Sequence, residues 1–132
     1  MQAAFLLVNI QYLNVWNIRR SEIAKMYLNQ LKNNSWFTLL NPGSEPSVWH
    51  HFPILAVDRG LLRSRLNEAG IATEVHYPHL AAREHAEIFG EIVHDFTVGE
   101  SISLRILSLP LSPWHTDEQI HHVCCELNSI TG

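Results

Sequence analysis

The sequence contains little charge, only two cysteines and no long apolar run. Cys124 and Cys125 are adjacent within a helical pattern, which does not suit a disulfide framework and favours a reducing cytoplasm. No apolar run reaches the roughly 18 residues that a membrane helix needs. The apolar start, residues 1–10, has no basic region and no small-residue cleavage site, so we expect no secretory signal. The nine Lys and Arg residues are scattered and form no basic stripe, so nucleic-acid binding is disfavoured.

The length and composition fit one packed globular domain spanning residues 1–132. The hydrophobic fraction of 46% is typical of a chain with a core rather than of a disordered one. The charged fraction of 17% is below the usual value of about 25%. We therefore expect another domain or subunit to cover part of the surface.

Residues 2–32 contain no Pro or Gly and predict a long helix. One apolar stripe follows helical spacing: Ala3, Leu6, Ile10, Leu13, Ile23, Ala24, Tyr27, Leu28 and Leu31. Further apolar residues cover most other faces of the first half: Ala4, Phe5, Leu7, Val8, Val15 and Trp16. A helix that is apolar all round is normally buried all round. We expect it to pack on its own domain on one side and, on the other, on a partner absent from this chain or on a second copy of the chain.

The rest of the chain predicts alternating strands and helices. We expect strands at 48–57, 72–76 and 104–109, and helices after Asp58, at 79–91, at 96–103 and after Thr116. Pro53 inside the first of these strands predicts an edge position or a bulge. The result is an α/β (α+β) fold over residues 47–130, with a sheet of about three strands covered by helices and preceded by the long helix of residues 1–32.

Helix ends in this part of the chain carry capping signals. Asp58 can cap the first turn of one helix, and Gly70 stands where a left-handed C-terminal cap prefers glycine. Thr116 and Gln119 form the pattern of a capping box. The expected buried stripes of the two helices are Leu62, Leu66 and Ala69, and Ile120, Val123, Cys124, Leu127 and Ile130.

The best candidate site residues are His76 and Tyr77. An imidazole and a phenol beside the rigid Pro78 could bond a phosphate or a sugar hydroxyl. The structural alternative is that Tyr77 closes the end of the sheet and His76 caps backbone groups. From the residues alone, both interpretations stay open.

Nine histidines raise the possibility of a metal site, but their spacing does not favour one. The pairs His50-His51 and His121-His122 are adjacent, and adjacent side chains on a strand or helix point apart. No His-Glu-x-x-His pattern occurs. Cys124 is expected to be a core thiol, and Cys125 has no evident base beside it.

Four stretches in order carry a resemblance to a known family. They are Gln2-Ala3-Ala4 with Arg19-Arg20, Ile23-Ala24 and Tyr27; Arg59-Gly60-Leu61-Leu62 with Gly70-Ile71-Ala72-Thr73; His76-Tyr77-Pro78; and Leu107-Ser108-Leu109-Pro110 with Thr116-Asp117-Glu118-Gln119-Ile120. Together they resemble the C-terminal part of the DegT/DnrJ/EryC1/StrS family, which are pyridoxal-phosphate (PLP)-dependent sugar aminotransferases of the aspartate-aminotransferase fold.

The resemblance implies the small domain of a type I PLP enzyme, without the large domain that carries the Schiff-base lysine and most cofactor contacts. Lys25 and Lys32 match nothing like the family's lysine motif, so we expect no catalytic, cofactor-binding or metal-binding residue in this chain alone. The resemblance makes His76 and Tyr77 substrate-side contacts. Residues 79–85 depart from the family pattern, so we expect this loop and its contacts to the sugar to differ from those of the family.

The reaction that the resemblance implies for the intact enzyme is amino transfer from an amino acid, with glutamate the expected donor, to a nucleotide-linked keto-sugar for surface polysaccharide. The implied partners are the missing PLP-binding domain or a second copy of this chain. The alternative hypothesis is a non-enzymatic dimerisation or interaction module derived from the same domain.

Overall fold

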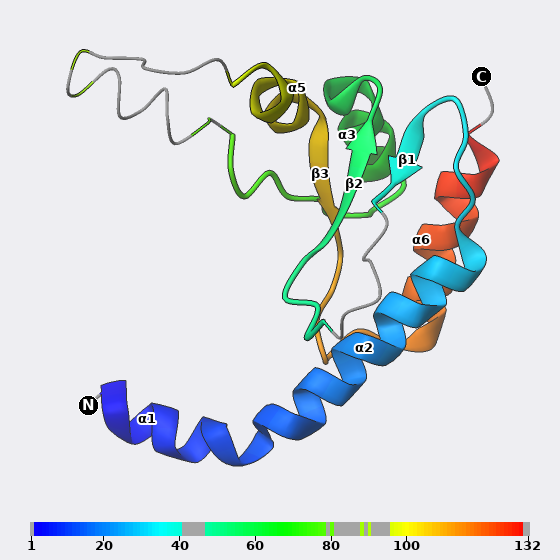
Figure 1. Cartoon of the computed structure of the whole chain (residues 1–132). Coiled ribbons are helices and arrows are strands. Elements are labelled where there is room, and N and C mark those ends of the chain that lie inside the picture. The colour runs from blue at the N-terminus through cyan, green and yellow to red at the C-terminus, as the bar shows by residue number, and fades with distance from the viewer. Residues whose placement is uncertain are drawn as a thin grey trace.

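The chain folds into a small sheet with helices around it and a long helical segment at its N-terminus. A computed structural model describes residues 2–40, 47–78, 80, 88, 90 and 96–130. In chain order the elements are α1 (Gln2–Asn9), the 3-10 turn η1 (Ile10–Tyr12), α2 (Leu13–Gln30), β1 (Phe37–Leu39), β2 (Phe52–Ala56), α3 (Arg59–Glu68), α5 (Thr97–Arg105), β3 (Ile106–Leu109) and α6 (Asp117–Ser129) (Figure 1). The predicted mixed fold, with three strands and a long N-terminal helix, is confirmed. Within the described residues, no helix combines the length and apolar character needed to span a bilayer.

The sheet is antiparallel, with the strands in the order β1-β2-β3. Its composition differs from the prediction in two places. The segment 72–76 makes only an isolated bridge, in which the backbones of Glu74 and Ser108 exchange hydrogen bonds of 3.1 and 2.8 Å. The third strand is instead β1, which sequence reasoning missed because three residues are too few to show a period of two.

Pro53 lies in β2, which is the central strand, so the predicted edge position is wrong for the strand as a whole. The pairing register explains how the proline fits. β1 pairs with Ala56, Leu55 and Ile54 and stops there, so Pro53 has only β3 beside it, opposite Ser108. At Pro53, β2 is therefore locally an edge, where a missing backbone N–H leaves no ladder bond unmade.

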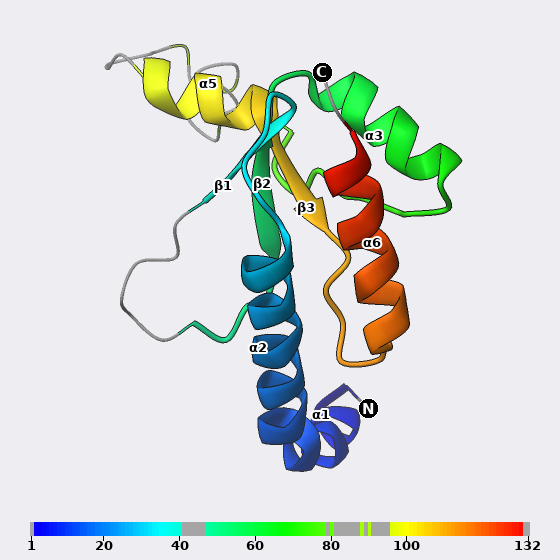
Figure 2. The ribbon, with the colours of Figure 1, turned by 90° about the vertical axis from the view of Figure 1, so that its right-hand side faces the viewer.

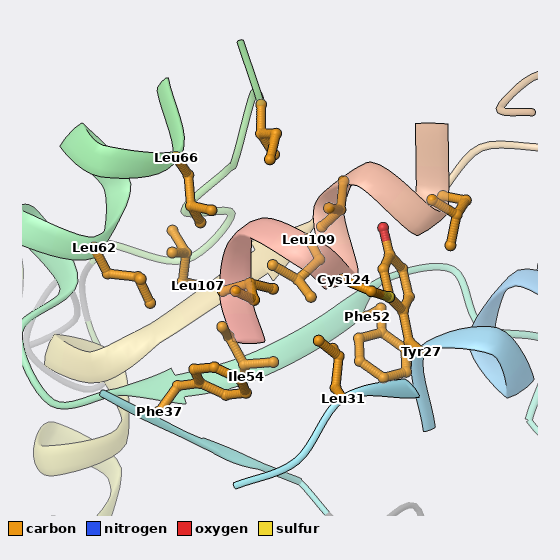
Figure 3. Close-up of a cluster of buried hydrophobic side chains, with 14 of the residues drawn as sticks. Tyr27, Leu31, Phe37, Phe52, Ile54, Leu62, Leu66, Leu107, Leu109 and Cys124 are labelled. Atoms are coloured by element: carbon orange, nitrogen blue, oxygen red, sulfur yellow. The ribbon is translucent and has the colours of Figure 1, made fainter. Parts of the chain in front are cut away.

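Alternate residues of β2 point into the core. Phe52, Ile54 and Ala56 are buried, and they meet apolar side chains of α2, α3, β3 and α6 (Figure 3). The core comprises Ile23, Ala24, Tyr27, Leu31, Phe37, Phe52, Ile54, Ala56, Leu62, Leu66, Ile71, Leu107, Leu109, Ile120, Val123, Cys124, Leu127 and Ile130. The predicted stripes of α3 and α6 are confirmed except at Ala69, which is only partly buried against the core.

The helices lie on both sides of the sheet. Figure 2 shows α3 and α6 on one side and α5 on the other, with α2 running alongside α6. Two arginines hold α3 and α5 near the sheet. Arg59 Nη1 donates to the carbonyl oxygen of Ser103 at 2.5 Å, and Arg105 Nε donates to that of Ala56 at 3.0 Å. These bonds fix α5 and the start of β3 against the end of β2.

The predicted caps are present. The Asp58 carboxylate accepts a hydrogen bond from the N–H of Leu61 at 2.9 Å. Gly70 has φ of 77°, and the N–H of Ile71 donates to the carbonyl oxygen of Leu66 at 2.8 Å, as in a left-handed helix end. Thr116 and Gln119 make both bonds of a capping box. These local signals need no tertiary contact, which is why the sequence predicts them well.

The long helical segment is interrupted and only partly buried. The 3-10 turn η1 separates α1 from α2, and Figure 1 shows α1 projecting away from the sheet. Ile23, Ala24 and Tyr27 of α2 are buried, as predicted, but α1 has no buried residue. The prediction that Ala3, Leu6, Ile10 and Leu13 pack on the chain's own domain is wrong, because the described part of the fold does not extend alongside α1.

The expected surplus of apolar surface on this segment is present. The exposed large apolar side chains of α1, η1 and the start of α2 are Phe5, Leu6, Leu7, Val8, Ile10, Tyr12, Leu13, Val15 and Ile18. We refer to these nine residues as the α1 apolar surface. Large apolar side chains exposed together on one segment typically mark an interface.

Two further predictions concern the second half of the chain. The short helix expected at 96–103 is observed as α5, and it extends to Arg105, so β3 begins later than predicted. Pro110 follows β3 directly, as expected. The helix expected at 79–91 lies almost entirely outside the described residues.

Candidate functional site

A pocket lies at the end of the sheet where β2 begins and β3 ends. Its volume is about 360 Å³. Its lining comes from α2, from the segment before β2, from the segment after α3, and from β3 with the segment that follows it. The lining residues are Arg20, His50, His51, Ala72, Glu74, His76, Ser108, Leu109, Pro110, Leu111, Ser112 and Pro113. Four separate parts of the chain therefore converge on one concave surface, the arrangement expected of a ligand site.

Three histidine rings gather at this pocket: those of His51 and His76 are stacked, and that of His50 is tilted by 50° against His51. The centroids of His51 and His76 are 3.7 Å apart with an interplanar angle of 28°, and those of His50 and His51 are 4.1 Å apart. The expectation that His50 and His51 point apart is wrong, because neither residue lies in a strand or helix. They follow Trp49, whose positive φ of 50° turns the chain just before β2.

The neighbouring rings affect the protonation of His51, which lies between His50 and His76. Burial lowers the pKa of His51, and the neighbouring His76 and His50 lower it further, while Glu74 acts in the opposite direction. The neutral imidazole is therefore favoured at His51. A neutral imidazole keeps one N–H donor and one acceptor nitrogen, so it can bond a phosphate oxygen or a sugar hydroxyl.

Of the two predicted site residues, His76 lines this pocket and Tyr77 does not. His76 Nδ1 is 3.8 Å from a Glu74 carboxylate oxygen. Tyr77 is 71% exposed and lines a second, smaller pocket of about 140 Å³ together with His51, Pro53 and His76. A tyrosine this exposed does not close the sheet within the described part of the chain. The two pockets share His51, Glu74, His76 and Ser108, so they adjoin each other, and His76 lines both.

Arg20, Ser108 and Ser112 also line the pocket and were not predicted as site residues. The Arg19-Arg20 pair was visible in the sequence, but nothing in one sequence says which arginine faces a pocket. Arg20 Nη2 donates to the Asn17 side-chain oxygen. Its Nε is buried and has no acceptor among the described residues.

No group of three or more His, Cys, Asp or Glu side chains within the described residues is arranged to hold a metal ion.

Cys124 is buried, and burial raises the pKa of its thiol to about 11. The prediction that Cys125 has no base beside it is wrong. Its Sγ lies 3.4 Å from Nε2 of His121, one turn earlier on α6.

The residues of this chain do not fit a PLP site by themselves. Schiff-base formation needs a lysine at the reacting centre. The only two lysines of the sequence, Lys25 and Lys32, are exposed, and neither lines the pocket. A covalently held cofactor would need a lysine from outside residues 1–132.

The fold has a counterpart among known proteins. Residues 1–128 match the DegT/DnrJ/EryC1/StrS aminotransferase family. The chain belongs to this family, whose members are PLP-dependent aminotransferases.

Two curated relatives illustrate the similarity. The erythromycin biosynthesis sensory transduction protein EryC1 of Saccharopolyspora erythraea is 36% identical over 135 residues, covering 98% of this chain and 36% of the relative. The dTDP-3-amino-3,6-dideoxy-alpha-D-galactopyranose transaminase of Aneurinibacillus thermoaerophilus is 32% identical over 129 residues, covering 97% of this chain and 35% of the relative. This chain thus spans about a third of the length of the curated relatives it matches.

Solved structures of family members have the same fold as this chain. DesV of S. venezuelae, in complex with a ketimine intermediate, superposes with a TM-score of 0.84 at 33% identity over 96% of this chain and 35% of DesV. NtdA of Bacillus subtilis, with bound cofactor PMP, superposes with a TM-score of 0.76 at 31% identity over 89% of this chain and 28% of NtdA. The conformation described above is therefore one that this family adopts.

Proposed function

We propose that residues 1–132 form one domain, the C-terminal small domain of a PLP-dependent aminotransferase that acts on a nucleotide-linked keto-sugar in the cytoplasm. In this proposal residues 1–32 are the helix leading from the PLP-binding domain, and residues 47–130 supply one wall of the substrate site. The observation that carries the proposal is the superposition on DesV over 96% of the chain. The nucleotide-linked substrate is suggested by the dTDP-sugar transaminase among the relatives.

The partner in this proposal is a PLP-binding large domain that covers the α1 apolar surface. Exposed Phe5, Leu6 and Leu7 are each about two-thirds accessible. Apolar side chains gain roughly 25 cal/mol for each Å² removed from water, so covering this surface supplies a substantial driving force for docking. The large domain would also supply the lysine that this chain lacks at its pocket. Residues 1–132 on their own would then be inactive.

Within the intact site, His76 and Tyr77 would contact the substrate. Both line the smaller pocket, and the exposed Tyr77 leaves its hydroxyl accessible to a ligand. Their role is to orient the sugar rather than to form bonds with the cofactor. A role in surface-polysaccharide synthesis stays a prediction, because the relatives described above include a protein of erythromycin biosynthesis.

A chimera tests the proposal. This chain replaces the corresponding C-terminal segment of the A. thermoaerophilus transaminase, and amino transfer to its dTDP-linked keto-sugar is measured. We expect turnover, with a raised KM when His76→Ala or Tyr77→Phe is introduced. A chimera that folds and shows the absorbance of bound PLP, yet transfers no amino group, would contradict the proposal. This chain alone, incubated with PLP and borohydride, should acquire no label on Lys25 or Lys32.

The α1 apolar surface equally supports a second candidate, a non-enzymatic module that pairs with another copy of this chain. Light scattering on the purified chain separates the two. A stable dimer that is unaffected by PLP and dTDP-sugars, and that Leu6→Glu converts to a monomer, would favour the module. Leu104→Glu on α5, also an exposed leucine, is the matched control.

A further inference from the structure

The two consecutive arginines of α2 differ sharply in their partners. Arg19 is bonded on several sides: Nη2 donates to the His115 carbonyl oxygen at 2.8 Å and to the Asp117 carboxylate at 2.6 Å, and Nη1 approaches Glu22 at 3.4 Å. These bonds tie α2 to the start of α6. The role of Arg19 is therefore structural.

Arg20 has no comparable set of partners. One bond, from Nη2, goes to the neutral amide oxygen of Asn17, which keeps the guanidinium on the surface of α2. The buried Nε has no acceptor within residues 2–40, 47–78 and 96–130. A buried donor without an acceptor costs free energy, more so when it is part of a charged group. Because Nε has no accessible surface, a ligand can reach Arg20 only through its terminal nitrogens.

The pocket beside Arg20 is large enough for a phosphate ligand. Its volume of about 360 Å³ exceeds what a phosphate needs and can accommodate a sugar phosphate. The hydroxyls of Ser108 and Ser112 and the imidazoles of His50, His51 and His76 add hydrogen-bonding groups to the same lining. The one carboxylate in the lining, Glu74, lies 3.8 Å from His76 Nδ1, on the side of the histidine stack. Arg20 is the one group of the lining with a permanent positive charge.

We propose that Arg20 is a phosphate-binding residue of this pocket, with its terminal guanidinium nitrogens directed at a phosphate group of the substrate. Guanidinium and phosphate match in geometry and charge, and two parallel N–H bonds give both strength and orientation. The inference rests on the proposed function, because it places the phosphate of a nucleotide-linked sugar in the same site. It adds Arg20 on α2 to His76 and Tyr77, the two residues expected from the sequence.

The first experiment uses nuclear magnetic resonance on the full 132-residue chain. Inorganic phosphate, dTDP and dTDP-glucose are titrated separately, with unphosphorylated glucose as the negative ligand. We expect the Nε–H resonance of Arg20 to shift with each phosphate-bearing ligand, while that of Arg19 stays in place. Glucose should shift neither. A larger effect of dTDP and dTDP-glucose than of inorganic phosphate would identify the nucleotide diphosphate, and the reverse order would identify a simple phosphate; both support a phosphate-binding Arg20.

Substitutions give the second measurement. Arg20→Gln should weaken dTDP binding by at least about tenfold, since a hydrogen bond to a charged group is lost. Arg19→Gln is the matched control, one residue away with the same loss of charge, and should change affinity by less than about twofold by the same reasoning. Arg20→Lys keeps the charge without the planar fork and should restore part of the affinity.

Two results would overturn the inference. One is an Arg20 Nε–H resonance that does not respond to millimolar phosphate ligands in the wild-type chain, a result that does not depend on how any variant folds. The other is equal loss of affinity in Arg19→Gln and Arg20→Gln. Failure of the proposed function is recognised separately, by a chimera that binds PLP without turnover. An unresponsive Arg20 beside an active chimera would remove this inference and leave the proposed function intact.

Discussion

Tyr27 and Pro110 join α2 to the segment that lines the pocket. The phenol of Tyr27 is buried and donates its hydrogen to the carbonyl oxygen of Pro110 at 2.7 Å. The ring also packs on Phe52, with 4.8 Å between centroids. Burial raises the pKa of Tyr27 well above its ordinary value, so the hydroxyl remains a donor across the physiological range. One side chain thus connects the core to the wall of the candidate site.

Tyr27→Phe should lower the free energy of unfolding by about 1 to 2 kcal/mol, because the ring packing survives while the Pro110 oxygen loses its donor. Urea denaturation followed by circular dichroism measures this. Tyr12→Phe is the control, since Tyr12 is 52% exposed and stacks on Trp16. Its stability should stay within about 0.5 kcal/mol of the wild type. Equal destabilisation by both substitutions would mean that the Tyr27–Pro110 bond contributes nothing of its own.

Leu107→Ala should lower the free energy of unfolding by about 3 kcal/mol. The side chain of Leu107 in β3 is fully buried in the core, so its truncation leaves a cavity. Leu104, three residues earlier on α5, is 67% exposed. Leu104→Ala should change stability by less than about 0.5 kcal/mol. Thermal or urea unfolding of the two variants gives the comparison, and a Leu107→Ala protein as stable as Leu104→Ala would contradict the described core.

Acid should destabilise the chain through His115. Its Nδ1 accepts a hydrogen bond from the backbone N–H of Ser112 at 3.0 Å, and burial together with the charge of Arg19 lowers the pKa of His115. The unfolded chain therefore binds this proton more readily than the folded one. Stability is fully present above the ordinary value of 6.5 and declines as the pH falls below it.

The measurement is the free energy of unfolding between neutral and acid pH for the wild type and His115→Asn. An asparagine oxygen can accept the Ser112 bond without titrating, so the variant should lose less stability on acidification. His51 acts in the same direction, because its pKa is also lowered. For that reason the difference between the two proteins, rather than either curve, is the test. Identical pH dependence would exclude His115 as a contributor.

Two glycines at opposite ends of α3 should respond in opposite ways to alanine. Gly70 has φ of 77°, and a Cβ there would meet no atom within 4 Å, so the cost of Gly70→Ala is backbone strain alone, about 1 kcal/mol. Gly60 lies in the first turn, where a Cβ would have an ordinary contact of 3.5 Å with Asp58. Gly60→Ala should stabilise the chain by about 0.5 to 1 kcal/mol. Melting temperatures that move in the same direction would contradict this assignment.

Local signals in the sequence predicted the helices well. The Asp58 cap, the Gly70 terminus and the Thr116–Gln119 capping box depend on bonds within a few residues, so they can be recognised without the fold. The strands were harder to predict from the sequence. β1 has three residues, and Ala72–His76 has strand-like composition but only one bridge, at Glu74. Pairing depends on a neighbour distant in sequence, and composition carries little information about that neighbour.

For the site, the sequence supplied His76 and Tyr77 but not the pocket beside them. Arg20 and His76 are 56 positions apart, and the histidine stack depends on the turn at Trp49. Whether an arginine faces a pocket or an ion pair is decided by what packs next to it. Arg19 and Arg20 are identical in type and adjacent, yet only their tertiary neighbours distinguish them.

The sequence by itself determined the family, the helix ends and the surplus apolar surface of α1, since each is carried by residue types at short spacing. Tertiary structure alone decided that β2 is the central strand, that Pro53 sits where β1 has ended, and that four distant segments enclose one pocket. The physical reason is that hydrogen bonding at helix ends and amphipathic periodicity are local, whereas strand pairing and the convergence of side chains depend on contacts between residues far apart in the chain.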